Sequence, residues 1–229
     1  MKGKIVVLCL LTACLLFSLP GCKTEEERAA AQAKENWEQT SDETRMGIYC
    51  ALIKEYMLLT EDLGENTPYP AMKRSVKGNM MSGGLTEAEA IESAKAVIIQ
   101  EQAVFWYGAN HGIDAGDDKV ADYIEENVLQ EIQASETYAA VDAMCAKEGI
   151  TYEDTVWAYE NSYKMQYILI QSGVSSEEEI QFVNQIIEDY SETEDCKKLT
   201  RILETCAALI ADDVTDKETL RNAEIYIEE

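Results

Sequence analysis

Basic residues, histidine and proline are all scarce in this 229-residue chain. Its 19 Lys and Arg stand against 44 Asp and Glu, which gives a net charge of −25. This balance argues against nucleic-acid binding and against docking on anionic lipids, because both need clustered Lys and Arg. Three Pro exclude collagen-like and Pro-rich classes. The 46% apolar content allows a sizeable core, so the chain is not disordered as a whole.

Sequence signatures of catalysis are also lacking. His111 is the only histidine, and its place in the last turn of a predicted helix is explained by the helix dipole. The chain has no phosphate-binding loop, dinucleotide fingerprint or G-x-S-x-G motif. Asp114, Asp117 and Asp118 resemble a calcium loop only faintly, because the Gly and the bidentate Glu are not at EF-hand positions. We therefore expect no enzymatic activity, no cofactor and no dedicated metal site.

The N-terminus has the features of an export signal. Lys2 and Lys4 precede an apolar run over residues 5–20, and small residues lead to Cys22 and a highly charged stretch. A charged start, a short apolar region and small residues before the cut are typical of a secretory signal. The apolar run is shorter than the ~20 residues that a membrane-spanning helix needs.

The segment Leu19-Pro20-Gly21-Cys22 resembles the lipobox of bacterial lipoproteins. The resemblance implies that residues 1–21 are removed and that Cys22 carries the lipid, which anchors the protein on the outer side of the cytoplasmic membrane or, in a Gram-negative source, in a periplasmic or outer-membrane leaflet. Cys14 is a weaker alternative, because an apolar stretch would remain after it. Residues 22–39 lack a sustained apolar stripe, and we expect a flexible or loosely helical tether there.

Residues 40–229 show helical spacing of apolar residues and no clear alternation with period two. Capping boxes and Gly stops predict helices over about 41–63, 86–111, 117–148 with a break near Ser135, 152–170, 176–190 and 193–212, with a short helix after residue 215. Residues 65–84 contain Pro and Gly and are expected to form a loop that holds the basic cluster Lys73, Arg74 and Lys77. The predicted fold is an all-α multi-helix bundle.

Four cysteines, Cys50, Cys145, Cys196 and Cys206, remain after the predicted cleavage. Cys196 and Cys206 are ten residues apart on one predicted helix, about 15 Å, so they cannot pair with each other. No cysteine has CxxC or His partners at zinc spacing. Pairing in an oxidising compartment stays open beside the interpretation that these residues are small buried hydrophobes.

Aromatic residues are the candidates for binding. Three consecutive rings on one helix cover about 200° of its circumference, so either two layers cover this helix or one ring is exposed. Four tyrosines at helical spacing form a second set that suits either a groove or a plain core. The candidate peptide-binding residues are Phe105, Trp106, Tyr107, Tyr152, Tyr159, Tyr163 and Tyr167.

Four stretches within residues 85–170 resemble the N-terminal peptide-binding domain of the SurA- and PrsA-type extracytoplasmic foldases. They are Leu85-Thr86-x-x-Glu89, Gln100–Phe105 through His111-Gly112-Ile113, Asp117-Asp118-Lys119-Val120-x-x-Tyr123-Ile124, and Gly149-Ile150-Thr151-Tyr152-Glu153-Asp154. The resemblance implies a helical bundle of the SurA N-terminal or trigger-factor type that binds unfolded or secreted polypeptides, with 171–229 as additional C-terminal helices. Residues 77–84 depart from the short strand with a hydrophobic-Asn-Gly turn that opens the family's domain.

The larger members of that family also carry a parvulin domain with paired histidines. The chain after Gly173 contains no His, so we expect no prolyl isomerase activity. The leading hypothesis is a chaperone-like lipoprotein that holds non-native or extended polypeptides. The alternative is a helical scaffold or accessory subunit for one folded envelope partner, which the basic cluster and the C-terminal helices would serve.

Overall fold

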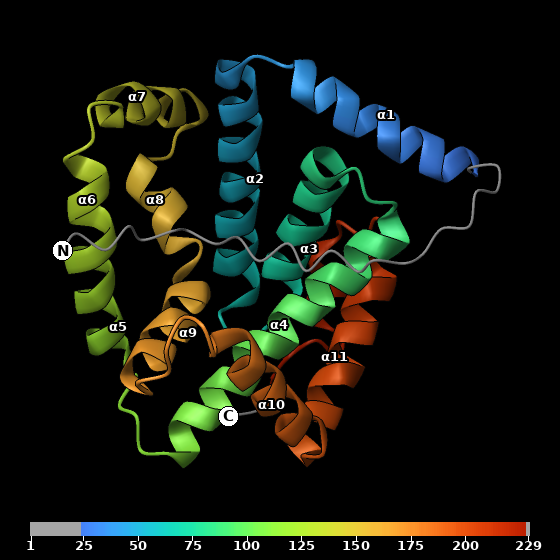
Figure 1. The fold of residues 1–229 in the computed structure, drawn as a ribbon. Helices are drawn as coiled ribbons and strands as arrows, with labels where there is room; N and C mark the ends of the chain where they lie inside the picture. Colours follow the sequence, from blue (N-terminus) through green and yellow to red (C-terminus); the bar gives the residue numbers. More distant parts are fainter. Residues whose placement is uncertain (1–23, 228–229) are drawn as a thin grey trace.

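The computed structural model describes residues 24–227, and within that range all regular secondary structure is helical, which confirms the predicted all-α class (Figure 1). The elements, with η marking π-helical turns, are α1 (Glu25–Gln39), α2 (Asp42–Leu63), α3 (Tyr69–Gly78), η1 (Asn79–Gly83), α4 (Glu87–Asn110), α5 (Asp117–Ile124), η2 (Glu125–Leu129), α6 (Gln130–Gln133), α7 (Tyr138–Glu148), α8 (Tyr152–Trp157), α9 (Glu160–Gln171), α10 (Glu179–Ser191), α11 (Glu194–Ala211) and α12 (Lys217–Arg221).

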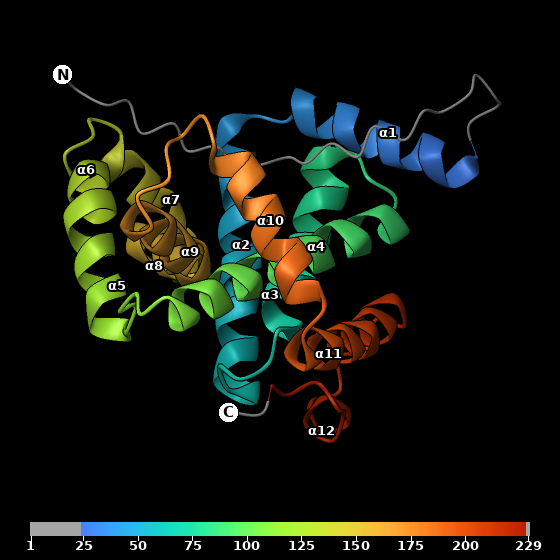
Figure 2. The same ribbon diagram turned by 60° about the horizontal axis from the view of Figure 1, so that its bottom comes forward.

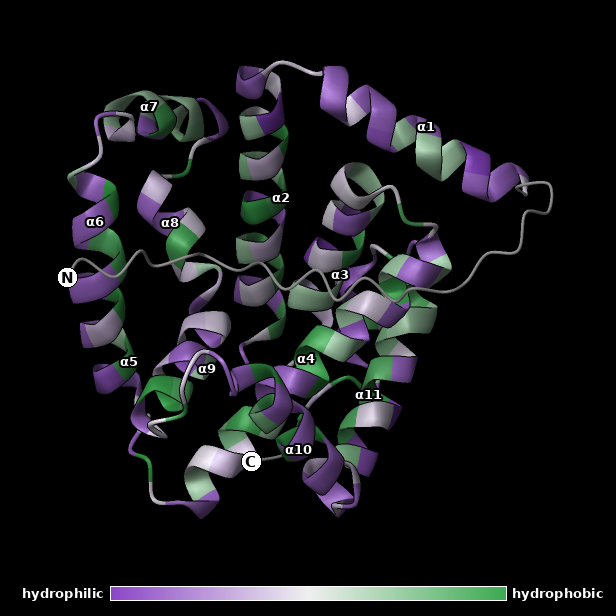
Figure 3. Cartoon of the chain, in the orientation of Figure 1, coloured by the Kyte–Doolittle hydropathy of each residue, from purple (hydrophilic) through white to green (hydrophobic). Residues whose placement is uncertain are grey.

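Helix α2 stands between α5–α9 on one side and α3 and α11 on the other, and α4 runs past α2 toward α9 (Figures 1 and 2). The largest apolar cluster includes Met72 on α3, Val104 on α4 and Leu203 on α11, and it extends to Ile168 on α9. A smaller cluster joins α2 to α7 and α8, and a third lies between α5, η2 and α8. Polar residues dominate α1, whereas α5 and α6 turn their apolar side toward α8 and α9 (Figure 3).

The predicted helix boundaries are correct where the signal is local. Thr86 and Thr151 form capping boxes at the starts of α4 and α8, because each hydroxyl accepts a hydrogen bond from the third helical N–H. Gly112 and Gly149 follow α4 and α7 with φ of 69° and 80°, as helix-ending glycines do. Helix α4 passes close to α9 at Gly108, where an added Cβ would lie 3.1 Å from the Ile168 side chain.

The expectation of a loop over residues 65–84 was wrong, because this segment contains α3 and η1. Pro70 lies in the first turn of α3, where its missing N–H costs no hydrogen bond, so it starts the helix instead of breaking it. Tyr69, Met72 and Val76 form a buried face at helical spacing. Packing of this face against α2 and α4 stabilises a helix that the Pro and Gly content argued against.

Residues 25–39, where we expected a flexible or loosely helical tether, form the regular helix α1. Its capping box pairs Thr24 with Glu27, and none of its side chains is buried. Helix α1 lies beside η1, where the Cβ of Lys34 approaches Gly84. The predicted signal, 1–21, and Cys22 lie outside the described residues. Within residues 24–227, no helix is both long and apolar enough to cross a bilayer.

The single helix predicted over 152–170 is interrupted after Trp157 and resumes as α9 at Glu160. In an unbroken helix the carbonyl of Ala158 would accept from the N–H of Ser162. Here the guanidinium of Arg74 donates to that carbonyl, and the N–H of Ser162 donates to Tyr159 instead. A tertiary contact from α3 thus replaces the hydrogen bond that would continue the helix.

Candidate functional site

The seven predicted binding aromatics do not converge on one groove. Each is half-buried, and they are divided among all three apolar clusters of residues 24–227. Phe105, Trp106, Tyr107 and Tyr167 border the largest cluster, Tyr152 and Tyr159 the second, and Tyr163 the third.

Two layers cover the three consecutive rings of α4, which settles the choice that the sequence left open. The Phe105 ring lies under the ammonium of Lys164 on α9, 5.4 Å from the ring centroid. On the other side, α10 contributes partners for the two remaining rings. Trp106 lies 5.9 Å from Tyr190, and Tyr107 meets Phe182 edge-on at 5.2 Å.

The tyrosine set is likewise engaged inside the chain. Ring centroids are 5.8 Å apart for Tyr152 and Tyr138, 6.4 Å for the stacked Tyr159 and Tyr49, and 5.7 Å for Tyr167 and Tyr123. Tyr163 packs against the apolar cluster of α5 and α8. Aromatic pairs of this kind add about 0.5–1.5 kcal/mol each to the area they bury. These rings therefore contribute to the stability of the fold.

His111 ends α4 and stacks on Tyr107, with ring centroids 3.9 Å apart. Its Nδ1 donates to the backbone carbonyl of Tyr107 over 2.8 Å, which fixes the proton on that nitrogen. The position agrees with the predicted helix-end role.

The basic cluster lies on α3, where the sequence predicted a loop, and Arg74 joins this helix to two other parts of the fold. The guanidinium lies between the rings of Tyr56 and Tyr159, 4.4 and 4.0 Å from their centroids. With its bond to the Ala158 carbonyl, Arg74 connects α3 to α2 and to the junction of α8 and α9. Tyr49 stacks on the far side of Tyr159. Burial, and then the neighbouring Tyr159, raises the pKa of Tyr49.

Lys73 and Lys77 share one carboxylate. Glu55 on α2 accepts from Lys77 at 2.7 Å and lies 3.4 Å from the largely buried Lys73. Burial of Glu55 opposes its ionisation, but the hydrogen bond and charge of Lys77, with Lys73 adding, outweigh burial and lower the pKa of Glu55. All three basic side chains are thus engaged within the fold.

A buried carboxyl lies next to this cluster. Glu101 on α4 is 8% exposed and accepts a hydrogen bond of 2.7 Å from the Ser162 hydroxyl. Burial raises the pKa of Glu101 above its ordinary value of 4.5, and the Ser162 bond and the charge of Arg74 only partly oppose this. Its polar neighbours are the Ser162 hydroxyl and the Arg74 guanidinium, which already has partners of its own.

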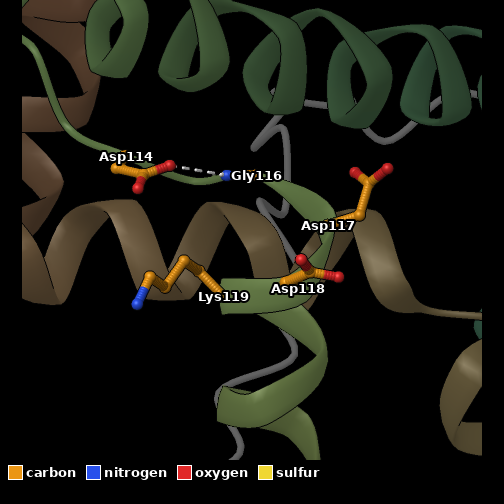
Figure 4. Close-up of a pocket in the computed structure, with 5 residues that line it drawn as sticks. All are labelled: Asp114, Gly116, Asp117, Asp118 and Lys119. Atoms are coloured by element: carbon orange, nitrogen blue, oxygen red, sulfur yellow. Dashed lines mark hydrogen bonds between the residues drawn. The ribbon is translucent and has the colours of Figure 1, made fainter.

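The acidic loop before α5 encloses a shallow hollow of about 300 Å³ (Figure 4). Asp114 turns back to accept from the N–H of Gly116, while Asp117 and Asp118 point away from it. A calcium ion needs several oxygens directed at one point, and these carboxylates do not provide them. No group of three or more His, Cys, Asp or Glu within 24–227 is arranged to hold a metal ion.

Exposed aliphatic side chains form a feature that the sequence did not predict. Ile170 at the end of α9 and Ile180 at the start of α10 are 58% and 60% exposed, on either side of the connection 172–178. Both lie on apolar stripes at helical spacing, and such periodicity defines a face of a helix but does not show what covers that face. Glu177 and Glu178 beside Ile180 are exposed too. The other exposed large apolar residues of the described range are Met57, Leu58 and Val97.

Comparison with known protein families, with curated proteins and with solved structures found no match.

Proposed function

We propose that this chain is a non-enzymatic, lipid-anchored extracytoplasmic protein that holds non-native or extended polypeptides. The fold proposed with it is the SurA N-terminal type, without prolyl isomerase activity. Lipidation at Cys22 remains a prediction, and the intact mass of membrane-derived protein should include a diacylglyceryl group on Cys22 as the first residue.

The observation that carries the proposal is the exposure of Ile170 and Ile180 on an acidic body. Because Ile170 and Ile180 are 58% and 60% exposed, burying the rest of each side chain contributes about 1–2 kcal/mol, which favours contact with apolar segments of an unfolded chain. The surrounding glutamates favour segments that also carry Lys or Arg, because complementary charges steer association. The preferred client is therefore apolar and basic.

The aromatic residues have a different part in this proposal from the one that the sequence suggested. Each has an intramolecular partner, so binding a client through them would break contacts that hold the helices together. We assign them to the core and its rim, and we place client binding at the exposed aliphatic residues.

The alternative is an accessory subunit for one folded partner, and it rested in part on the basic cluster. The basic cluster that would have faced a partner is engaged by Glu55, by two tyrosine rings and by a backbone carbonyl. These contacts give each of the three basic side chains a partner inside the chain, so we do not assign the cluster to a second protein.

The test measures whether the full chain slows aggregation of chemically unfolded basic and acidic client proteins. The expected result is suppression that is stronger for basic clients and falls by half or more in the double variant Ile170→Ser/Ile180→Ser. The matched control is Leu58→Ser/Val97→Ser, which removes two exposed aliphatics on α2 and α4 and should retain activity. Failure of the unaltered chain with every client would refute holding activity. Equal activity of both double variants would refute the assigned surface.

A further inference from the structure

Two cysteines far apart in the sequence meet in the second apolar cluster. Cys50 on α2 and Cys145 on α7 are separated by 95 residues, and their Sγ atoms lie 2.9 Å apart as free thiols. Both side chains are fully buried. Nonbonded carbon atoms sit about 3.5–4.0 Å apart, and sulfur is larger, so this contact is already closer than ordinary packing.

We propose that Cys50 and Cys145 form an intramolecular disulfide when the chain folds under oxidising conditions, while Cys196 and Cys206 remain thiols. A disulfide of about 2.05 Å requires the two sulfurs to approach by about 0.9 Å. Cys196 and Cys206 are both on α11, ten residues apart, and within the described chain neither has a cysteine sulfur in contact.

The bond forms by thiol–disulfide exchange with a disulfide oxidant, either a small molecule such as oxidised glutathione or a protein. One thiol loses its proton and attacks the oxidant, forming a mixed disulfide and releasing one oxidant thiolate. The second cysteine, as its thiolate, then attacks the bridged cysteine and releases the other half of the oxidant. Two cysteine thiols are oxidised by two electrons and lose two protons, and the oxidant is reduced to two thiols.

The timing of this reaction follows from burial. Attack needs a thiolate that an oxidant can reach, and the folded chain exposes neither sulfur. Burial, followed by the neighbouring Cys50, raises the pKa of Cys145 to about 12. The bond therefore forms while α2 and α7 are still coming together, and the finished disulfide is shielded from reductants.

A disulfide here would join α7 covalently to α2. Cys145 is the only fully buried side chain of α7. The remaining polar ties to α2 are the bond from Lys54 to the Glu148 carbonyl and the exposed pair Lys147–Glu43. Cross-linking across a loop of this length restricts the unfolded chain strongly.

The test refolds the full chain from reductant and denaturant in a mixture of oxidised and reduced glutathione, alkylates the remaining thiols and digests with trypsin without reduction. Mass spectrometry should find peptide 46–54 joined to peptide 120–147, with the peptides carrying Cys196 and Cys206 alkylated. The cysteines of the N-terminal segment fall on a separate peptide, 5–23. Alkylation of Cys50 and Cys145 to the same extent as Cys196 and Cys206 would overturn the proposal, as would preferential linkage of either to another cysteine.

A second measurement separates the bond from packing. Cys50→Ala/Cys145→Ala and the control Cys196→Ala/Cys206→Ala each remove two buried sulfurs. When the oxidised control is unfolded, reduced and refolded in reductant, its Tm should be roughly 5–15 °C lower than before. Loss of one long-loop disulfide has about that effect at this chain length. The Tm of Cys50→Ala/Cys145→Ala should not change on reduction. An equal shift in both variants would contradict the assignment, and peptide mapping of the unaltered chain decides the matter if either variant fails to fold.

Discussion

Arg74→Lys should destabilise the protein far more than a change between two basic residues usually does. The substitution keeps the positive charge but loses the flat guanidinium between Tyr56 and Tyr159 and its bond to the Ala158 carbonyl. Each cation–π contact is worth about 0.5–2 kcal/mol, and a hydrogen bond from a charged donor about 1.5–3 kcal/mol. Since an ammonium retains part of the attraction to the rings, we expect the free energy of unfolding to fall by about 2–4 kcal/mol.

Urea unfolding followed by tryptophan fluorescence and circular dichroism measures this change, and Trp157 lies next to Ala158 as a local probe. The matched control is Arg45→Lys on α2, where the arginine pairs with the exposed Asp42 one turn away. That pair should contribute less than about 0.5 kcal/mol. If the two variants unfold at the same urea concentration, the account of Arg74 as the connection between α3 and the α8–α9 junction is refuted.

Three further perturbations test other parts of the fold. Glu101→Gln should become more stable than the unaltered chain as pH rises above about 4.5, because the raised folded-state pKa means that ionisation of Glu101 destabilises the folded protein. If the melting temperatures of the two proteins differ by the same amount at pH 4 and pH 7, this inference is refuted. Gly84→Ala, whose Cβ would lie 2.6 Å from Lys34, should loosen α1 in hydrogen exchange, whereas Gly112→Ala, also at positive φ but with open space, should not. Trp106→Ala should lower the free energy of unfolding by about 3–5 kcal/mol, and an unchanged melting temperature would argue against its packing on α10.

The sequence predicted correctly those parts of the fold whose cause is local. A capping box needs only four consecutive residues, so Thr86 and Thr151 identify the starts of α4 and α8 without reference to the rest of the chain. Gly112 and Gly149 identify the ends of α4 and α7 for the same reason. The exclusion of a bond between Cys196 and Cys206 rests only on helix geometry, and both residues do lie on α11.

The errors have tertiary causes. In residues 69–78 the local signals conflict, because Tyr69, Met72 and Val76 have helical spacing whereas Pro70 and the nearby Gly argue for a loop. Burial of this face against α2 and α4 decides for the helix. At the interruption after Trp157, the guanidinium of Arg74 donates to the carbonyl of Ala158, 84 residues further along the chain. The local pattern of residues 152–170 does not contain this contact and therefore predicts one helix. Contacts across such distances decide the fold wherever local signals are weak or contradictory.

The same distinction explains why the binding candidates and the exposed surface differ. Helical spacing shows that Phe105, Trp106 and Tyr107 cannot share one buried face, but it does not show that α9 and α10 cover α4 from two sides. Ile170 and Ile180 raise the opposite problem, because their spacing is that of core residues and no helix covers them. Under the proposed function, substitution of a covered ring would weaken client binding only by unfolding the protein, whereas substitution of an exposed isoleucine would weaken it in a protein of unchanged stability. Measuring melting temperature beside aggregation suppression therefore separates a client-binding residue from a residue that only maintains the fold.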